Sequence, residues 1–241
     1  MLFRSGSRLK PLTSITCKQL LPVYDKPMIY YPLSTLMLSG IREVLMIVTP
    51  NELGKFQEIF RDGSRLGMRI EFATQILPEG IPQAFIIGEK FIGNESVALI
   101  LGDNVFHGLG LDLELKSLRE ISGAQIFAHK VSNPQDYGVI SFDEKFNPVA
   151  IVEKPKTRVS EYAIPGLYFY DSNVVNYAKG LSKSARNEYE IVDLNKIYLS
   201  QKKLNVKLLP GGTAWLDMGT FESLHDASSF VRVLEQRQGQ K

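Results

Sequence analysis

The sequence has a single cysteine, few histidines and almost no net charge. Cys17 alone excludes an internal disulfide, and we expect a reducing compartment. His107, His129 and His225 are far apart and match no metal-ligand spacing. The formal net charge of +2 gives no support for binding to nucleic acid or to a membrane surface.

Long apolar runs are also missing, so no segment is expected to span a bilayer. The stretch Met1–Gly6 lacks the apolar core of a secretory signal, and the cytoplasm is the expected location. The 241 residues, of which 44% are hydrophobic, are enough to bury one large core. We therefore expect one domain over residues 1–241, in two parts of about 1–131 and about 132–241.

The first two-thirds of the chain alternates strand and helix patterns. Strands are predicted at residues 44–49, 69–75, 97–101 and 124–131, and helices at 51–60, 82–91 and 111–121. Asn51 is the expected cap of the first of these helices. Strands separated by helices of this length favour βαβ units, so we predict an α/β fold with a mostly parallel central sheet and helices on both faces.

The pattern changes after residue 131. Three strand-like runs at 137–142, 149–153 and 162–170 have few helix signals between them, which predicts an added mixed or antiparallel region. Helices are predicted at 173–181, 191–201 and 220–236, the last with Thr220 as its N-cap, and a short strand at 205–209.

An acidic residue follows the apolar run 97–100, in the tetrapeptide Leu101-Gly102-Asp103-Asn104. Open α/β sheets bind ligands at the carboxyl ends of their strands. Gly102 lets a ligand approach the backbone, and Asp103 is then placed to hold magnesium against phosphate oxygens. The alternative is that Asp103 caps the following turn.

Two segments near the start of the chain carry groups that suit phosphate. Lys18 can place a point charge on a phosphate, and Gly6-Ser7-Arg8 offers backbone donors and a guanidinium. The alternatives are a solvated surface lysine and a flexible terminus.

Two further segments carry groups that suit a base and a sugar. Gln75, with Gly80 after it, can donate and accept together, as reading a pyrimidine edge requires, although the segment also reads as a turn. Glu153 can accept sugar hydroxyls while Lys154 neutralises a sugar phosphate; a surface ion pair is the alternative.

The only tryptophan lies beside an acidic residue in Trp215-Leu216-Asp217-Met218-Gly219. Trp215 can be ordinary core, and Asp217 can cap the next helix or supply a second carboxylate to the ion held by Asp103. Taken together, these groups suit phosphoryl or nucleotidyl transfer to a sugar phosphate, which needs positioning and charge neutralisation more than a protein nucleophile.

Nearly the whole chain resembles the bacterial glucose-1-phosphate thymidylyltransferases. The most specific part is the stretch from Lys18 to Leu38, which is typical of the thymidylyl branch of sugar nucleotidyltransferases. The other matching segments are Gln83–Glu89, Leu101–Asn104, Tyr137–Val139, Glu153–Pro155, Gly166–Asp171, Ser184–Arg186 and Trp215–Gly219.

The resemblance implies that the phosphate oxygen of glucose 1-phosphate attacks the α-phosphorus of dTTP, so that dTDP-glucose forms and pyrophosphate leaves. Asp103 and Asp217 would bind the Mg²⁺ ion. The groups implied to carry the charge of catalysis are Arg8, Lys18, Asp103, Lys154 and Asp217. A UTP-preferring uridylyltransferase is the alternative within the enzymes.

The same resemblance implies the contacts of both substrates. Gln19, Gln75 and Gly80 would recognise thymine, beside the phosphate-binding Gly6 and Ser7. Gly138 and Glu153, with Lys154, would hold the sugar phosphate. Ile164, Tyr168 and Trp215 would lie near the sugar, and Arg186 close to the phosphates. A homo-oligomer, a tetramer or a dimer, is the expected assembly.

The chain departs from the family pattern at both ends. The family begins with a short apolar strand leading into Leu-Ala-Gly-Gly-x-Gly-Thr-Arg-Leu, whereas Ser5–Leu9 matches only the end of that motif. Phe3 and Arg4 stand where two glycines belong, and would obstruct the triphosphate. The sheet is expected to lose a ladder of backbone bonds, each worth about 1 kcal/mol net. A catalytically impaired protein that still binds a nucleotide sugar is therefore a second alternative. The chain also ends at Lys241, before the family's helical tail, so loss of feedback control is expected.

Overall fold

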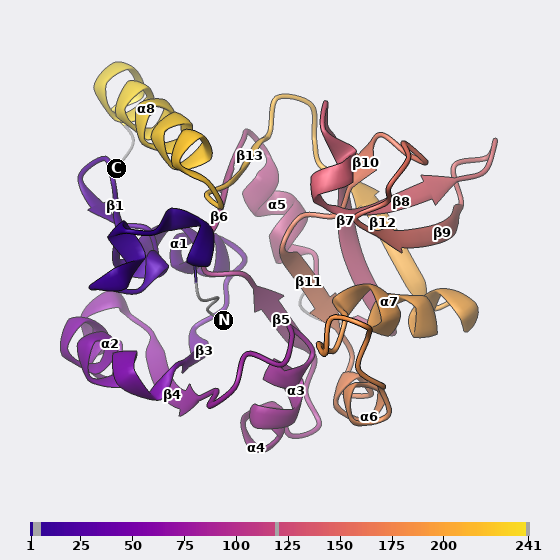
Figure 1. The fold of residues 1–241 in the computed structure, drawn as a ribbon, viewed down its shortest axis with the longest axis horizontal. Helices are drawn as coiled ribbons and strands as arrows, with labels where there is room; N and C mark the ends of the chain where they lie inside the picture. Colours follow the sequence, from indigo (N-terminus) through magenta and orange to yellow (C-terminus); the bar gives the residue numbers. More distant parts are fainter. Residues whose placement is uncertain (2–5, 119–120, 240–241) are drawn as a thin grey trace.

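A computed structural model describes residue 1, residues 6–118 and residues 121–239. Its helices and strands form an α/β molecule in which segments far apart in the sequence share one sheet (Figure 1). The predicted α/β class is therefore confirmed. Two of the strand pairings are parallel, and the other strand pairings of the described residues are antiparallel. The parallel pairs are β3 Glu43–Val48 with β4 Arg69–Thr74, and β7 Ala124–Lys130 with β12 Leu204–Leu208.

The largest sheet has seven strands, in the order β5-β11-β7-β10-β8-β9, with β12 also paired to β7. The strands β5 and β7 come from the first part of the chain, and the others come from its second part. Their bounds are β5 Val97–Ile100, β7 Ala124–Lys130, β8 Gly138–Phe142, β9 Pro148–Glu153, β10 Tyr162–Ala163, β11 Leu167–Tyr170 and β12 Leu204–Leu208.

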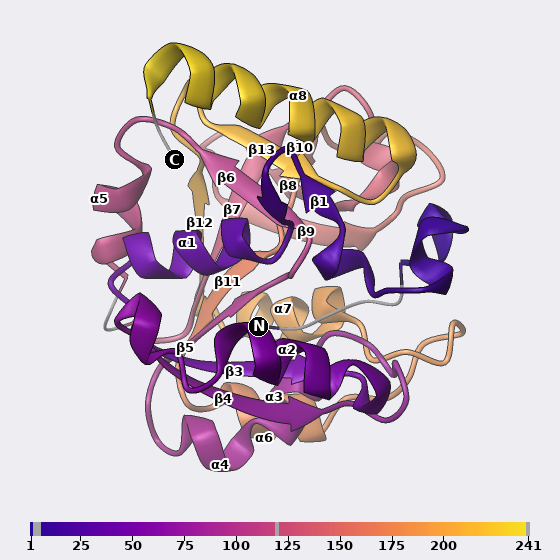
Figure 2. The same ribbon diagram turned by 90° about the vertical axis from the view of Figure 1, so that its left-hand side faces the viewer.

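The alternation of β11 explains why helices cover both faces of this sheet. Tyr168 and Tyr170 belong to one core cluster, together with four of the helices, while Leu167 and Phe169 belong to the opposite cluster. On the first face lie α3 Gln83–Ile87, α4 Glu89–Ile92, α6 Val174–Lys179 and α7 Ile191–Ser200; on the second lie α1 Tyr30–Leu38, α2 Leu53–Phe60 and α5 Leu111–Lys116. Figure 2 shows α1 above β5 and α3, α4 and α6 below it.

Three pairs of strands lie outside the large sheet. The parallel pair is β3 Glu43–Val48 with β4 Arg69–Thr74, joined by α2. The antiparallel pairs are β1 Pro22–Val23 with β2 Lys26–Pro27, and β6 Asn104–His107 with β13 Ala214–Asp217. The register of the last pair sets Asp217 directly opposite Asn104.

The last helix, α8 Phe221–Gln238, has a capping box in which Thr220 accepts a hydrogen bond from the Ser223 backbone N–H. The predicted Thr220 cap is therefore confirmed. Ala227 and Val231 of α8 are buried against Val23, Val105 and Met218. This helix crosses the top of the molecule in Figure 2.

The expectation of an incomplete first strand concerns Met1 and the space between β3 and β5. Met1 donates from its amino group to the Leu45 carbonyl at 2.9 Å and accepts from the Ile47 N–H at 3.0 Å, which is the pattern of a parallel strand. Beside it a cavity lined mainly by apolar side chains separates β3 from β5, and it includes Val44, Val97 and Leu99. Phe3 and Arg4, expected to obstruct the triphosphate, lie outside the described residues.

Several predicted elements have different bounds. The strand predicted at 162–170 is two strands, because Pro165 and Gly166 interrupt it. The helix predicted at 82–91 divides at Gly88 into α3 and α4. The prediction that Asn51 caps a helix is wrong: Asn51 lies in a short turn at 50–52, and α2 begins after Glu52 with no side-chain cap.

Candidate active site

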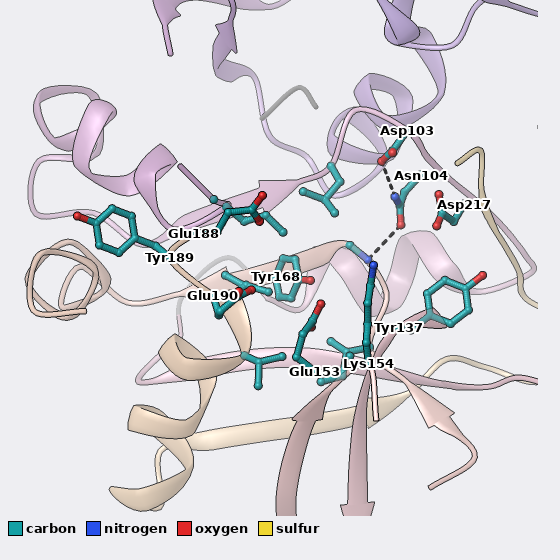
Figure 3. A pocket seen from close by; sticks show the side chains of 18 of the residues that line it. Asp103, Asn104, Tyr137, Glu153, Lys154, Tyr168, Glu188, Tyr189, Glu190 and Asp217 are labelled. Carbon is teal, nitrogen blue, oxygen red and sulfur yellow. Dashed lines mark hydrogen bonds between the residues drawn. The ribbon is translucent and has the colours of Figure 1, made fainter. Parts of the chain in front are cut away.

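A cleft lies between the carboxyl end of β5 and the region formed by β8, β9 and α7. Figure 3 shows its side chains: Asp103, Asn104 and Asp217 are grouped at one end, and Glu188 and Tyr189 lie at the other. Twelve residues singled out from the sequence line this cleft: Arg8, Gln75, Gly80, Asp103, Gly138, Glu153, Lys154, Ile164, Tyr168, Arg186, Trp215 and Asp217.

The two predicted carboxylates come together because β6 pairs with β13. Asp103 immediately precedes β6, and Asp217 ends β13 opposite Asn104. The Met218 N–H donates to the Asp103 carbonyl at 3.1 Å, which extends this pairing by one step. Two acidic side chains separated by more than one hundred residues therefore line one end of the same cleft.

Asp103 is nearly buried, with 5% of its surface exposed, and forms an ion pair with Lys18, which is 3% exposed. A buried charge needs a partner of this kind, because desolvating an unpaired ion costs several kcal/mol. Lys18 lies in a short turn, Lys18–Leu20, and Gly6 packs against its side chain. Lys18 and Gly6 thus reach the cleft through Asp103 rather than by lining it.

Asn104 joins the acidic end of the cleft to its aromatic wall. Its side-chain Nδ2 donates to Asp103 Oδ1 at 2.9 Å. Its Oδ1 accepts from the Gly166 N–H at 3.1 Å and from the Trp215 Nε1–H at 2.6 Å. This buried amide therefore fixes a carboxylate and an indole ring in one arrangement, as a fully satisfied polar network does.

Arg8 lies beside Asp217 because Gly219 leaves room for its guanidinium. A Cβ atom at Gly219 would come within 2.7 Å of the Arg8 guanidinium and 3.2 Å of Asp217 Oδ1. The Tyr137 phenol is close by: burial, followed by the carboxylate of Asp217, raises the pKa of Tyr137 above its ordinary value. The Tyr137 ring lies 5.0 Å from that of Trp215, centroid to centroid. A cation and an aromatic wall therefore flank the second carboxylate.

Glu153 and Gly138 face each other across β8 and β9. A Cβ atom at Gly138 would stand 3.1 Å from Glu153 Oε2, so the glycine leaves this carboxylate open to the cleft. Arg186 contacts Glu153 at 3.1 Å and Glu190 at 2.6 Å. The hydrogen bond to Glu190 is the main cause that raises the pKa of Arg186. The Arg186 guanidinium is therefore held beside the sugar-facing carboxylate expected from the sequence.

Lys154 follows β9 with a φ of 42°, a left-handed conformation that costs energy in a residue other than glycine. Its backbone N–H donates to the Tyr137 carbonyl at 3.0 Å, which holds this turn in place. Lys154 lines the cleft, and Figure 3 shows it beside Glu153. Ile164 and Tyr168 supply apolar surface nearby.

The opposite end of the cleft holds Gln75, which follows β4 and is 6% exposed. Gly80 has a φ of 108° and forms a backbone bridge with Tyr189. A Cβ atom at Gly80 would lie 2.1 Å from the Tyr189 carbonyl oxygen, so only glycine permits this approach. The loop after β4 is thereby attached to the segment before α7.

Besides Lys18 and Gly6, two predicted site residues lie apart from the lining of the cleft. Ser7 is exposed in a short turn at Ser7–Leu9. Gln19 is 1% exposed, and its backbone carbonyl accepts from the Ile29 N–H. Gln19 directly follows Lys18, which pairs with Asp103, so Gln19 lies next in the chain to a residue that contacts the acidic end of the cleft.

Sequence reasoning missed several residues that line the cleft, chiefly Asn104, Tyr137, Tyr189 and Glu190. Asn104 could have been found, because it follows Asp103 directly. Tyr189 and Glu190 carry no local signal, since the backbone bridge from Gly80 brings them to the site.

The described residues contain no group of three or more His, Cys, Asp or Glu side chains suited to a metal ion. None of the described helices is long and apolar enough to cross a membrane.

Comparison with known proteins assigns the family. The family model described as nucleotidyl transferase matches residues 5–233. A glucose-1-phosphate thymidylyltransferase of Mycobacterium tuberculosis is 55% identical over 98% of this chain and 82% of its own length. The chain belongs to the glucose-1-phosphate thymidylyltransferase family. Another member, from Neisseria meningitidis, is 52% identical over 96% of this chain and 81% of its own length.

Solved structures agree with the family assignment. A putative glucose-1-phosphate thymidylyltransferase from Bacillus anthracis, in complex with a sucrose, superposes with a TM-score of 0.87 at 35% identity, covering 96% of this chain and 93% of that one. A UDP-glucose pyrophosphorylase complexed with UDP-glucose has a TM-score of 0.81 at 22% identity, covering 96% of this chain and 97% of that one, which shows a shared fold. This thymidylyltransferase family member therefore has the nucleotidyltransferase fold, and the cleft described above lies within it.

Proposed function

We propose that the chain transfers the thymidylyl group of dTTP to glucose 1-phosphate, forming dTDP-glucose and pyrophosphate. The observation that carries the proposal is the cleft itself, in which an amide end and an acidic end are joined by a wall bearing Glu153 and Lys154. Relatives with 47–55% identity over nearly the whole chain carry the name of this activity.

The chemistry needs positioning and charge neutralisation. An oxygen of the sugar phosphate forms a bond to the α-phosphorus, and the bond from that phosphorus to the bridging oxygen breaks. Pyrophosphate leaves with the electron pair, and no proton has to be removed, because the attacking phosphate is already anionic. Arg8, Lys18 and Lys154 would offset the charge brought together by the two substrates.

The acidic end of the cleft fits a divalent cation. Asp103 and Asp217 present hard carboxylate oxygens, and Asn104 and Lys18 hold the Asp103 carboxylate in place. Mg²⁺ is commonly held by one or two carboxylates together with substrate phosphates. Asp103 and Asp217 would hold the Mg²⁺ ion, which supplies electrostatic stabilisation of the phosphate oxygens when bound.

The remaining contacts follow from position along the cleft. Gln75, Gly80 and Gln19 would bind thymine, with Gln19 near the end of the cleft that holds the phosphates. Gly6 and Ser7 would lie toward the phosphates. Gly138 and Glu153 would accept the sugar hydroxyls, with Ile164, Tyr168 and Trp215 against the sugar ring. Arg186, held beside Glu153, would lie close to the phosphates.

The proposal is tested by pyrophosphate release with glucose 1-phosphate and either dTTP or UTP. We expect magnesium-dependent turnover with a preference for dTTP. A strong preference for UTP would overturn the thymidylyl assignment. Calorimetry with dTTP and dTDP-glucose separates binding from turnover: binding without turnover would instead support a catalytically impaired nucleotide-sugar-binding protein.

We also propose that the chain forms a homo-oligomer in the cytoplasm. Exposed apolar side chains next to α5 support an interface, since Leu109 is 93% exposed and Leu113 is 69% exposed. Light scattering during size-exclusion chromatography tests the assembly, and a monomeric mass at micromolar concentration would contradict it.

A further inference from the structure

Four side chains at the amide end of the cleft are joined end to end. Gln75 donates from Nε2 to Gln83 Oε1. Gln83 donates from Nε2 to Glu79 Oε2 at 2.8 Å. Glu79 Oε1 accepts from the Lys183 ammonium, which comes from the segment before α7. The chain of bonds thus runs from Gln75 in the cleft to a cation in the segment before α7.

The direction of these bonds is fixed by the chemistry of the two ends. An ammonium only donates and an ionised carboxylate only accepts, so Gln83 must turn its Nε2 toward Glu79. Its Oε1 then faces Gln75, which must turn Nε2 toward Gln83. The Gly80 carbonyl, 3.4 Å from the same Nε2, also accepts. Gln75 therefore presents its remaining polar atom, the acceptor Oε1, to a ligand in the cleft that it lines.

We call this chain of hydrogen bonds from Gln75 through Gln83 and Glu79 to Lys183 the relay. The backbone holds its far end in place. The Tyr189 N–H donates to the Glu79 carbonyl at 2.7 Å, and Gly80 forms its bridge with Tyr189. The Lys183 ammonium also lies 5.5 Å from the centre of the Tyr189 ring. The hydrogen bond to Glu79 raises the pKa of Lys183, which keeps this group charged. Glu79 is therefore held by this backbone bond as well as by its exposed ion pair with Lys183.

We infer that Glu79 and Gln83 are positioning residues that make Gln75 an obligatory acceptor, so that the cleft selects pyrimidines with an N–H at ring position 3 and rejects cytosine. This inference rests on the proposed function, because it takes the nucleobase to lie against Gln75. Thymine and uracil carry that N–H, whereas cytosine carries an acceptor lone pair there. A mismatched pair of acceptors leaves buried polar groups unpaired, which is how a polar site rejects a close analogue.

Glu79→Gln tests the inference because it supplies a donor where the carboxylate had none. The Lys183 ammonium still donates to the oxygen of the new side chain, so the new amide turns its Nε2 toward Gln83. The hydrogen bonds from there to Gln75 can then reverse their direction. Binding of dTTP, dUTP and dCTP with Mg²⁺ is measured by calorimetry, so the result does not depend on turnover. We expect the dTTP-to-dCTP affinity ratio to fall at least tenfold, while the dTTP-to-dUTP ratio stays within twofold, because both bases carry the N–H.

Glu89→Gln is the matched control, since Glu89 forms an exposed ion pair with Lys179 away from the cleft. It should leave both ratios unchanged. Gln83→Met is a second variant, which frees Gln75 to rotate and should also lower the dTTP-to-dCTP ratio. Thermal melting identifies which variants are folded.

The outcomes separate the relay from the function beneath it. Wild-type protein that binds none of the three triphosphates refutes the proposed function and the relay with it. Wild-type protein that prefers dTTP to dCTP, with both folded variants retaining the full preference, refutes the relay alone. A fall in the dTTP-to-dUTP ratio by the same factor would also refute it, because the effect would then not concern the ring N–H.

Discussion

At the scale of single residues, the acidic end of the cleft was predictable in part. Asp103 stands out because an acidic residue follows an apolar strand, and Asp217 because it lies between tryptophan and glycine. Their proximity depends on the pairing of β6 with β13, and neither strand was predicted from the sequence. Asn104 was missed as a connector because a local sequence does not show which distant groups, here Gly166 and Trp215, meet its amide.

Asp103→Asn should lower the rate of pyrophosphate release by a factor of about 10³ or more, because charge stabilisation by one group contributes several kcal/mol to such transition states. The amide keeps the shape of the side chain, but Lys18 loses its buried counter-charge. Breaking a buried pair costs about 3–5 kcal/mol, so the melting temperature should also fall while the far-ultraviolet spectrum stays native.

Asp112→Asn is the control for that change, because Asp112 forms an exposed pair with Lys116. It should alter neither turnover nor melting appreciably. Near-normal magnesium-dependent activity of Asp103→Asn would show that the metal assignment is wrong.

Lys154→Ala should raise the KM for glucose 1-phosphate about tenfold or more and leave the KM for dTTP nearly unchanged, since Lys154 is proposed to offset the charge of the sugar phosphate. Steady-state kinetics with each substrate varied in turn measures both. Lys156→Ala, an exposed lysine two residues along the chain, is the matched control. An unchanged KM for the sugar phosphate in Lys154→Ala would contradict the role.

At the scale of elements, periodicity located the buried strands and the amphipathic helices well. Phe56 and Phe60 are buried on one face of α2 as their spacing predicts. Boundaries failed where a tertiary contact decides them. Pro165 and Gly166 separate β10 from β11, and the two strands have different partners on the side away from β7, β8 for β10 and β5 for β11. No local pattern distinguishes that arrangement from one long strand.

Gly80→Ala should separate the loop after β4 from the segment before α7. The added Cβ would meet the Tyr189 carbonyl, and a φ of 108° strains an alanine. We expect a loss of about 2 kcal/mol or more in the free energy of unfolding and weaker binding of dTTP. Gly54→Ala, in α2 with open space around it, should instead stabilise by about 0.5–1 kcal/mol. Urea titrations of both variants test this contrast, and equal effects would contradict it.

The buried amino group of Met1, beside β3, predicts that folding stability depends on pH. Burial lowers the pKa of the Met1 amino group to about 5 from 8.0. Between pH 8 and pH 5 the unfolded chain then binds a proton that the folded chain does not, so folding stability falls as the pH falls. Protein with an acetylated Met1 lacks this group. The stability difference in favour of the acetylated protein should therefore grow from pH 8 to pH 5, reaching up to about 4 kcal/mol.

Urea unfolding of the two forms at pH 8, 6.5 and 5 measures that difference directly. All other titrating groups are common to both proteins and cancel. A difference that stays constant across this range would show that the amino group is not held neutral in the folded state.

At the scale of the whole molecule, the cleft has walls from both parts of the chain. Strand β5 of the first part pairs with β11 of the second, and the Gly80–Tyr189 bridge joins the parts again at the amide end. Composition and periodicity indicate the class of fold but not these connections, because pairing between segments distant in sequence is decided by the assembled core. The resemblance to a family supplied the set of site residues, and the structure supplies the pairings that bring most of them to one cleft.

This arrangement predicts how each ligand protects the backbone from hydrogen exchange. Glucose 1-phosphate should protect mainly β8 and β9, where Gly138 and Glu153 face the cleft. Nucleotide with Mg²⁺ should protect residues 75–83 and residues 183–190 together, because backbone bonds of Glu79 and Gly80 join these segments to Tyr189. Opening of either segment then breaks the contacts of both. Gly80→Ala should uncouple them, so that nucleotide protects residues 75–83 more than residues 183–190. Equal protection of both segments in that variant would show that the bridge does not couple the two walls.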